Sequence, residues 1–148
     1  MIEKTGAAAV DVDALILENE RLKSNVKYLE TNYRRLEAFV NSAPFLVYIK
    51  NSERQYTMFN EVRERQFDLK TDDILWHTDM DLAGNSWGAL SYEQDGKALG
   101  GQTVESLESS PRADNGCNWL VVRFPFVDAE GERYIGAVGL DISQRKAA

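Results

Sequence analysis

Residues 118–143 read NWLVVRFPFVDAEGERYIGAVGLDIS, and this stretch decides the fold. An apolar run led by Trp119 passes through Pro125, and a second run, which contains two glycines, ends at Asp141-Ile142-Ser143. Between the two runs, residues 128–132 combine Asp, Glu and Gly, which is the composition of a tight turn. The stretch therefore predicts two antiparallel strands, over residues 118–126 and 133–143.

Shorter elements are predicted upstream of this hairpin. Strands are expected over residues 45–50, 55–60 and 102–107, and short helices over residues 61–67, 71–76 and 87–99. Asn60 is the expected N-cap of the first of these helices. Two strands, several helices and then three strands are typical of an α+β fold, a five-stranded antiparallel sheet with short helices on one face. Both alternating sets of side chains in strand 118–126 are apolar, so we expect the N-terminal helix or a dimer partner to cover the second face.

A heptad pattern precedes this domain and predicts a long amphipathic helix over residues 12–40. Its seam consists of Val12, Leu15, Asn19, Leu22, Val26, Leu29, Tyr33, Leu36 and Val40. Leu at d with mostly β-branched residues at a favours a parallel homodimeric coiled coil, and Asn19 would fix its register. The alternative is a helix that packs its stripe on its own domain. A basic leucine zipper is excluded, because residues 1–14 contain a single basic residue, Lys4.

Composition sets the class of protein and its partners. The chain has 148 residues, 43% of them hydrophobic, which suits one domain with an extension. A net charge of -7 argues against nucleic acid and anionic lipid as partners. A lone cysteine, Cys117, and the lack of a signal-like leader predict a cytoplasmic location. No apolar run approaches the roughly 18 residues that span a bilayer, so we expect no membrane contact within this chain.

The expected organisation is a leader (1–11), a dimerisation helix (12–40), a sensor domain (41–143) and the start of a truncated output helix (144–148).

Several short motifs in their order resemble the PAS family, in particular its sensory-box type. They are Ala43-Pro44, Phe59-Asn60, Thr78-Asp79-Met80-Asp81-Leu82, Asp95, Trp119, Arg123-Phe124-Pro125-Phe126-Val127-Asp128, Gly131 and Gly139-Leu140-Asp141-Ile142-Ser143. The resemblance covers residues 36–145. The chain departs from the family pattern at the turn 51–54, which lacks the usual Gly, and at Trp76-His77, where the family often has Gly and Lys.

The resemblance implies a bacterial signal-transduction module that binds a small molecule between its sheet and its helices. It also implies that the module dimerises and passes a change of state to a histidine kinase, a cyclase or a transcription regulator. Asp141 and Ser143 would then mark the exit of the chain toward that output. The alternative is a ligand-free module for protein–protein interaction and dimerisation.

Candidate ligand-binding residues are aromatic or soft side chains with one cation. They are Met58, Trp76, Trp87, Tyr92 and Trp119, with Arg123 as an anion anchor. The alternative is that these side chains fill the core and Arg123 pairs at the surface.

The chemistry of the other residues narrows the choice of cofactor. Cys117 lies outside the helical motif that flavin photochemistry of the LOV kind needs, and helix 87–99 has no His to ligate haem. His77 is expected to be a solvated or capping residue, and no second His or Cys exists to build a zinc site. A noncovalent flavin or another small organic ligand remains open. Asp79 and Asp81 are expected to cap and pair locally, and no nucleophile accompanies them, so we predict no enzymatic activity.

Overall fold

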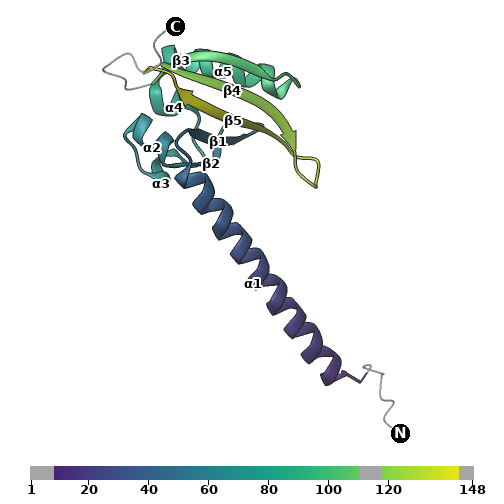
Figure 1. The fold of residues 1–148 in the computed structure, drawn as a ribbon. Helices are drawn as coiled ribbons and strands as arrows, with labels where there is room; N and C mark the ends of the chain where they lie inside the picture. Colours follow the sequence, from purple (N-terminus) through teal and green to yellow (C-terminus); the bar gives the residue numbers. More distant parts are fainter. Residues whose placement is uncertain (1–8, 111–117, 144–148) are drawn as a thin grey trace. The chain divides into compact units, whose positions relative to one another are not determined.

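The structure is a computed structural model that describes residues 9–110 and 118–143. The chain divides into two units, Met1–Phe39 and Val40–Ala148. Helix α1, which spans Val12–Ser42, supplies the first unit and continues into the second (Figure 1). Its first turn is capped by Asp11, whose Oδ1 accepts a hydrogen bond from the backbone N–H of Ala14 at 3.2 Å. No helix among the described residues is long and apolar enough to cross a membrane.

The predicted seam of α1 carries large apolar side chains that remain exposed. Their exposed fractions are 62% for Val12, 55% for Leu15, 49% for Leu22, 52% for Val26, 64% for Leu29, 66% for Tyr33 and 64% for Leu36. The helix contains no buried residue. Glu18 pairs with Arg21 in the same helix, where Nη2 and Oε1 are 2.6 Å apart. The helix itself was predicted correctly, and its pairing in a coiled coil stays a prediction.

The second unit is an antiparallel sheet with short helices, as predicted. Its elements are β1 (Leu46–Asn51), β2 (Tyr56–Phe59), α2 (Glu61–Phe67), α3 (Thr71–Ile74), α4 (Asp79–Ala83), α5 (Asn85–Leu99), β3 (Val104–Ser109), β4 (Asn118–Val127) and β5 (Arg133–Asp141). The five strands lie in the order β2-β1-β5-β4-β3, and each neighbouring pair is antiparallel. Helix α5 packs along β3, β4 and β5, and α2 packs on β1 (Figure 1). This architecture confirms the α+β class.

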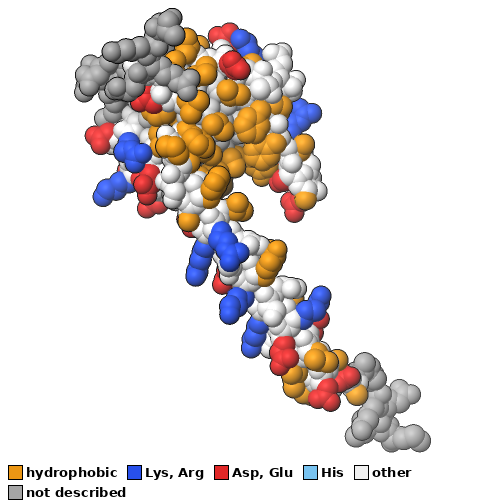
Figure 2. Space-filling model, viewed as in Figure 1, with side chains coloured by type: hydrophobic (Ala, Val, Ile, Leu, Met, Phe, Trp, Pro, Cys, Tyr) orange, Lys and Arg blue, Asp and Glu red, His pale blue; other side chains and the backbone are white. Residues whose placement is uncertain are grey.

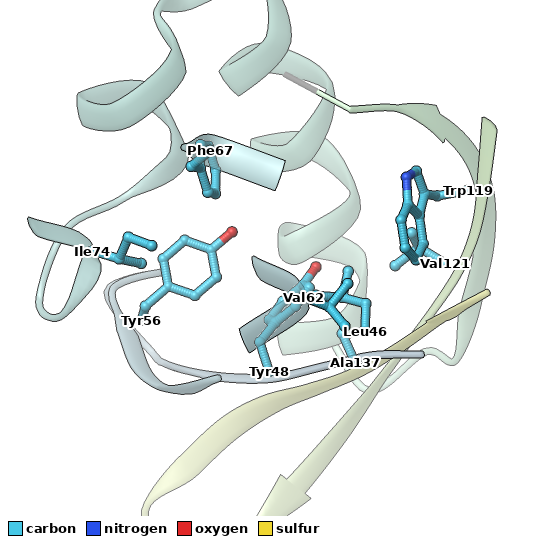
Figure 3. Packing of buried hydrophobic residues seen from close by; sticks show 9 residues of the cluster. All are labelled: Leu46, Tyr48, Tyr56, Val62, Phe67, Ile74, Trp119, Val121 and Ala137. Atoms are coloured by element: carbon cyan, nitrogen blue, oxygen red, sulfur yellow. The ribbon is translucent and has the colours of Figure 1, made fainter. Parts of the chain in front are cut away.

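Strand alternation separates the two faces of the sheet. On β1, Leu46, Tyr48 and Lys50 are buried and face the helices, whereas Val47 and Ile49 are half-buried and face the other way. The helix-facing set forms the core together with side chains from β2, β4, β5 and the short helices (Figure 3). The core residues are Leu46, Tyr48, Tyr56, Val62, Phe67, Ile74, Trp119, Val121 and Ala137.

The opposite face of the sheet is apolar and partly open. Leu107, Leu120 and Leu140 are neighbours in the registers of β3, β4 and β5. Leu107 is 66% exposed, Leu140 is 40% exposed and Phe124 on β4 is 36% exposed. Hydrophobic side chains gather over the sheet in the space-filling view (Figure 2). That the N-terminal helix or a dimer partner covers this face stays a prediction.

Two residues at positions where the sequence departs from the PAS pattern have left-handed backbones. Arg54, at the end of the β1–β2 turn, has φ 65°, and Trp76, between α3 and α4, also has φ 65°. Only glycine adopts this region without a steric cost, which explains why glycine is usual at these two places. The side chain of Asn51 supports the first turn, since its Oδ1 accepts hydrogen bonds from the N–H groups of Glu53 and Gln55 at 3.0 Å each.

Asn60 is the N-cap residue of α2, as predicted, but its side chain serves another purpose. Asn60 occupies the N-cap position, but its side chain makes no capping hydrogen bond. Its Nδ2 donates to the carbonyls of Val40 at 3.0 Å and Phe45 at 2.8 Å, and its Oδ1 accepts from the N–H of Val47 at 3.2 Å. Asn60 is fully buried. The side chain therefore ties β1 to the residues that precede it, because those buried backbone groups need partners.

Candidate functional site

Three of the six candidate pocket residues lie on the helix-facing side of the sheet. Trp119 and Arg123 project from the buried face of β4, with exposed fractions of 9% and 0%. Trp87, on α5, packs edge-on against Phe67, with ring centroids 5.6 Å apart, and its Nε1 donates to the carbonyl of Ser109 at 2.9 Å. Because Arg123 is fully buried, the alternative that it pairs at the surface is wrong.

The other three candidates lie elsewhere. Trp76 is 62% exposed between α3 and α4, and Tyr92 on α5 is 50% exposed. Met58 pairs with Ile49 across β1 and β2, so its side chain shares the face of the sheet that is turned away from the helices. Among the described residues, the six candidates do not surround one cavity.

A network of buried charged side chains occupies the space between the sheet and helices α4 and α5. At its centre, Lys50 donates from Nζ to Asp95 Oδ2 at 2.7 Å and also to Asp79. Asp79 accepts further hydrogen bonds from the hydroxyl groups of Ser91 and Tyr56. All five side chains are at most 4% exposed. These contacts join β1 and β2 to α4 and α5.

Arg123 extends this network to β3 and β4. Its Nε donates to Asp95 Oδ1 at 2.9 Å, so Asp95 bridges Lys50 and Arg123 through its two oxygens. The remaining guanidinium nitrogens bind Glu108 in a bidentate arrangement, at 2.5 and 3.1 Å. Nη2 also donates to Ser91 Oγ at 3.1 Å. A planar guanidinium can hold one carboxylate through two parallel hydrogen bonds and still reach a second carboxylate through Nε, which the compact ammonium of a lysine cannot do.

The local fields keep these groups ionised. Burial alone would raise the pKa of Asp79, but the charges of Lys50 and Arg63 and hydrogen bonds from Lys50 and Ser91 outweigh it and hold that pKa well below its usual range. Burial likewise opposes ionisation of Glu108, and the hydrogen bonds and charge of Arg123 lower its pKa. The pKa of Lys50 is raised, because Asp79 and Asp95 outweigh the effect of burial. Asp79, Glu108 and Lys50 are therefore charged at neutral pH.

Sequence reasoning missed most of this network, although some signals were present. Lys50 follows Leu46 and Tyr48 at a spacing of two, which places it on the buried face of β1. Ser91 and Asp95 are four residues apart on α5 and thus share one helix face.

The prediction that Asp79 and Asp81 both cap and pair locally is wrong for Asp79. Asp81 forms a reciprocal capping box with Thr78, as expected, and its neighbour Asp79 pairs with the distant Lys50. The two carboxylates point in different directions because residues two apart lie on different sides of a helix.

A crevice of about 150 Å³ leads from the surface to the network. Asp79 and Asp95 line it, together with Tyr92 and Arg54. The guanidinium carbon of Arg54 lies 3.7 Å from the centroid of the Tyr92 ring, and Arg54 Nε has no hydrogen-bond partner in the part of the chain that the structure describes. The crevice thus has an aromatic ring and a guanidinium beside two buried carboxylates.

The remaining predicted positions lie outside the network. Asp141, at the end of β5, accepts hydrogen bonds at Oδ1 from the N–H and hydroxyl of Ser143, at 2.9 and 2.5 Å. This turn closes the described part of the chain at its C-terminal side. His77 is exposed, as expected, with Nδ1 2.9 Å from the carbonyl oxygen of Leu75. Cys117 and residues 144–148 fall outside the described residues.

Relatives among known proteins agree with this architecture. The methanogenesis regulatory histidine kinase FilI of Methanothrix harundinacea is 26% identical to this chain over 131 residues. The match covers 87% of this chain but only 15% of the length of FilI. Similar structures include the VqmA–ligand–DNA complex of Vibrio cholerae, at TM-score 0.65 and 17% identity over 78% of this chain and 53% of that one. The PAS domain of BvgS from Bordetella pertussis matches at TM-score 0.58 and 16% identity over 78% of this chain and 89% of that one. At sequence identities as low as those of the two structures, the similarity shows a shared fold and no more.

The family comparison covers the whole globular unit. A family model described as PAS fold matches residues 40–147, which include every strand of the sheet and the buried network. This match spans well over half of the 148 residues. The chain belongs to the PAS fold family.

Proposed function

We propose that this chain is a cytoplasmic, non-enzymatic sensory module that homodimerises through residues 12–40 and relays the binding of a small molecule to an output domain. The observation that carries the proposal is the buried network, which joins α4 and α5 to β1, β3 and β4 through paired charges. A crevice reaches two of its carboxylates. A ligand that favours one arrangement of these pairs shifts the population toward that arrangement, and both the helices and the sheet respond.

The exposed seam of α1 supports the dimer. Leu22 and Leu29 leave 49% and 64% of their surface in contact with water, although they lie in a strict seven-residue repeat. Water disfavours such a stripe, and an identical helix covers it with complementary knobs and holes. Asn19, at an a position, would pair with its copy and select the parallel register.

The relay to an output domain is supported by the FilI relative. That protein is a histidine kinase, and the chain matches only 15% of its length, so a sensory segment within a longer signalling protein is the arrangement that we infer.

Sedimentation equilibrium tests the dimer with a matched pair of variants. Leu22→Asp places a charge in the seam, and Leu17→Asp places the same charge on the opposite side of the same helix, where Leu17 is 67% exposed. We expect dimers for the wild type and for Leu17→Asp, and monomers for Leu22→Asp. A monomeric wild type at micromolar concentration would remove the dimer from the proposal.

A second candidate function is that of a ligand-free interaction module, and the open apolar face of the sheet favours it. Leu107 and Leu140 expose 66% and 40% of their surface on that face, beside half-buried Leu120. Native mass spectrometry of the purified protein separates the two functions. A bound small molecule from the expression host supports the sensor, and a bare chain under conditions that preserve weak complexes supports the interaction module. An absorption spectrum of the same sample identifies flavin or haem at once.

A further inference from the structure

Four aromatic rings surround the guanidinium of Arg63 inside the domain. Its central carbon lies 4.5 Å from the ring centroid of Tyr48, 5.0 Å from Phe67, 5.3 Å from Tyr56 and 5.6 Å from Trp87. Arg63 is 3% exposed. Ring faces carry negative electrostatic potential and attract cations, so these four residues form a cation-binding cage, which the chain fills with its own arginine.

The cage satisfies the charge of Arg63 but few of its hydrogen bonds. Nη1 donates to Gln66 Oε1 at 2.6 Å. Among the residues that the structure describes, Arg63 Nε is buried without a hydrogen-bond partner, and so is the hydroxyl of Tyr48. Within the described residues, no carboxylate lies within ion-pair distance of Arg63. A guanidinium carries five N–H donors, and each buried donor that stays unpaired costs about 1–3 kcal/mol. Arg63 is therefore an imperfect occupant.

The charge balance of the interior requires one cation in this cage. The neighbouring network holds three carboxylates, Asp79, Asp95 and Glu108, against two cations, Lys50 and Arg123. Arg63 supplies the third positive charge, and its field helps to lower the pKa values of Asp79 and Glu108. Removing Arg63 from the cage leaves a buried excess of one negative charge, which another monovalent cation can neutralise without protonation of a carboxylate.

We propose that the cage of Tyr48, Tyr56, Phe67 and Trp87 is the ligand site of the sensor, and that it accepts an organic monocation of the quaternary ammonium class in exchange for Arg63. A quaternary ammonium carries the required charge and has no N–H group, so it fills the cage without unpaired donors. This inference rests on the proposed ligand-sensing function and names its ligand class.

The local structure allows this exchange. Arg63 lies on α2, a helix of seven residues whose other face is exposed at Glu61 and Arg65. Trp87 is the one partly exposed ring of the cage, so that side lies nearest to the surface. An Arg63 side chain that leaves the cage gains water as a partner for all of its donors, which offsets part of the cost of leaving.

Titration of the wild-type protein with tetramethylammonium chloride tests the proposal. Binding is followed by calorimetry and by the indole N–H resonance of Trp87 in nuclear magnetic resonance spectra, with the exposed Trp76 as internal reference and sodium chloride as the ionic-strength control. We expect a saturable shift of the Trp87 resonance and no comparable shift of Trp76. Arg63→Ala removes the internal competitor and should tighten binding by about tenfold or more, whereas Arg65→Ala on the same helix should leave it unchanged.

Each outcome has a definite meaning. A wild-type protein whose Trp87 resonance and heat of mixing do not respond to tetramethylammonium overturns the proposal, and this holds even where Arg63→Ala fails to fold. Binding by Arg63→Ala without binding by the wild type also overturns it, because Arg63 is then a permanent part of the core. If native mass spectrometry still detects another bound molecule, the sensory function stands and only the ligand class falls.

Discussion

Replacing Lys50 with Met tests whether the buried network stabilises the fold. Lys50 is fully buried, and its ammonium group forms an ion pair with the carboxylate of Asp79. Methionine keeps most of the length and apolar volume of lysine but removes the charge. Asp95 retains Arg123, whereas Asp79 loses its paired cation. Removing one partner of a buried pair leaves an uncompensated charge, so we expect the free energy of unfolding at neutral pH to fall by about 3–5 kcal/mol.

Acid should narrow the difference between Lys50→Met and the wild type. In the wild type, burial opposes ionisation of Asp79, but Lys50 and Arg63 dominate and depress its pKa in the folded state. The carboxylate therefore contributes stability above its unfolded pKa, and this contribution is lost as the pH falls through the folded value. Without Lys50 we expect the pKa of Asp79 to rise. The variant then binds a proton in its folded state at a higher pH than the wild type does, and acidification costs it less stability.

Urea unfolding followed by far-ultraviolet circular dichroism, at neutral pH and at about pH 5, measures both effects. Lys97→Met is the matched control, because Lys97 lies on exposed α5 surface with Nζ 3.7 Å from Glu93 Oε1. We expect this surface variant to lose less than about 0.5 kcal/mol. Equal losses in the two variants, or a gap between Lys50→Met and the wild type that widens in acid, would refute the role assigned to Lys50.

Three further substitutions probe the same domain. Arg123→Lys should lower the free energy of unfolding by about 2 kcal/mol or more, because an ammonium cannot hold Glu108 bidentately and also reach Asp95. A thermal unfolding curve that matches the wild type would contradict this. Trp76→Gly should stabilise the fold by about 1 kcal/mol, because glycine removes the backbone strain of a left-handed residue at a mostly exposed position. A melting temperature below that of the wild type would show that the backbone of Trp76 is not strained. Gly88→Ala should destabilise by about 1–3 kcal/mol, because its Cβ would lie 2.9 Å from the Cα of Met80, and an unchanged denaturation midpoint counts against this close approach.

The strands and the longer helices could be predicted because each carries a periodic signal. Apolar runs located β1, β4 and β5, and the polar turns that bound these runs located the hairpins. Helix α4 was not predicted, since five residues are too few to show a helical period, and only the Thr78–Asp81 capping box marks its start. Strand β3 begins at Val104 and ends at Ser109, two residues later at each end than predicted, because polar residues dominate it.

The buried network could not be predicted as a whole, because its charged members come from five separate elements. Asp95 looks like a solvent-facing charge in a local window, and burial of a charge is rare enough that this local interpretation is usually right. Only the pairing of all of these charges across the interior makes their burial tolerable. The aromatic candidates show the same limit: aromatic type alone does not separate Trp87, which joins a cage, from Trp76, which is exposed.

Strand β4 is where a change in the interior can reach the outer face of the sheet. Arg123 faces the network, and its two neighbours in the chain, Val122 and Phe124, face the opposite side. A shift of the Arg123 backbone therefore moves side chains on the surface that the second candidate function would use. Adjacency alone does not demonstrate coupling, so a double-mutant cycle is required. A cycle that combines Arg63→Ala with Phe124→Ala should give an interaction energy above about 0.5 kcal/mol if the two faces are coupled, and additivity would show that they act independently.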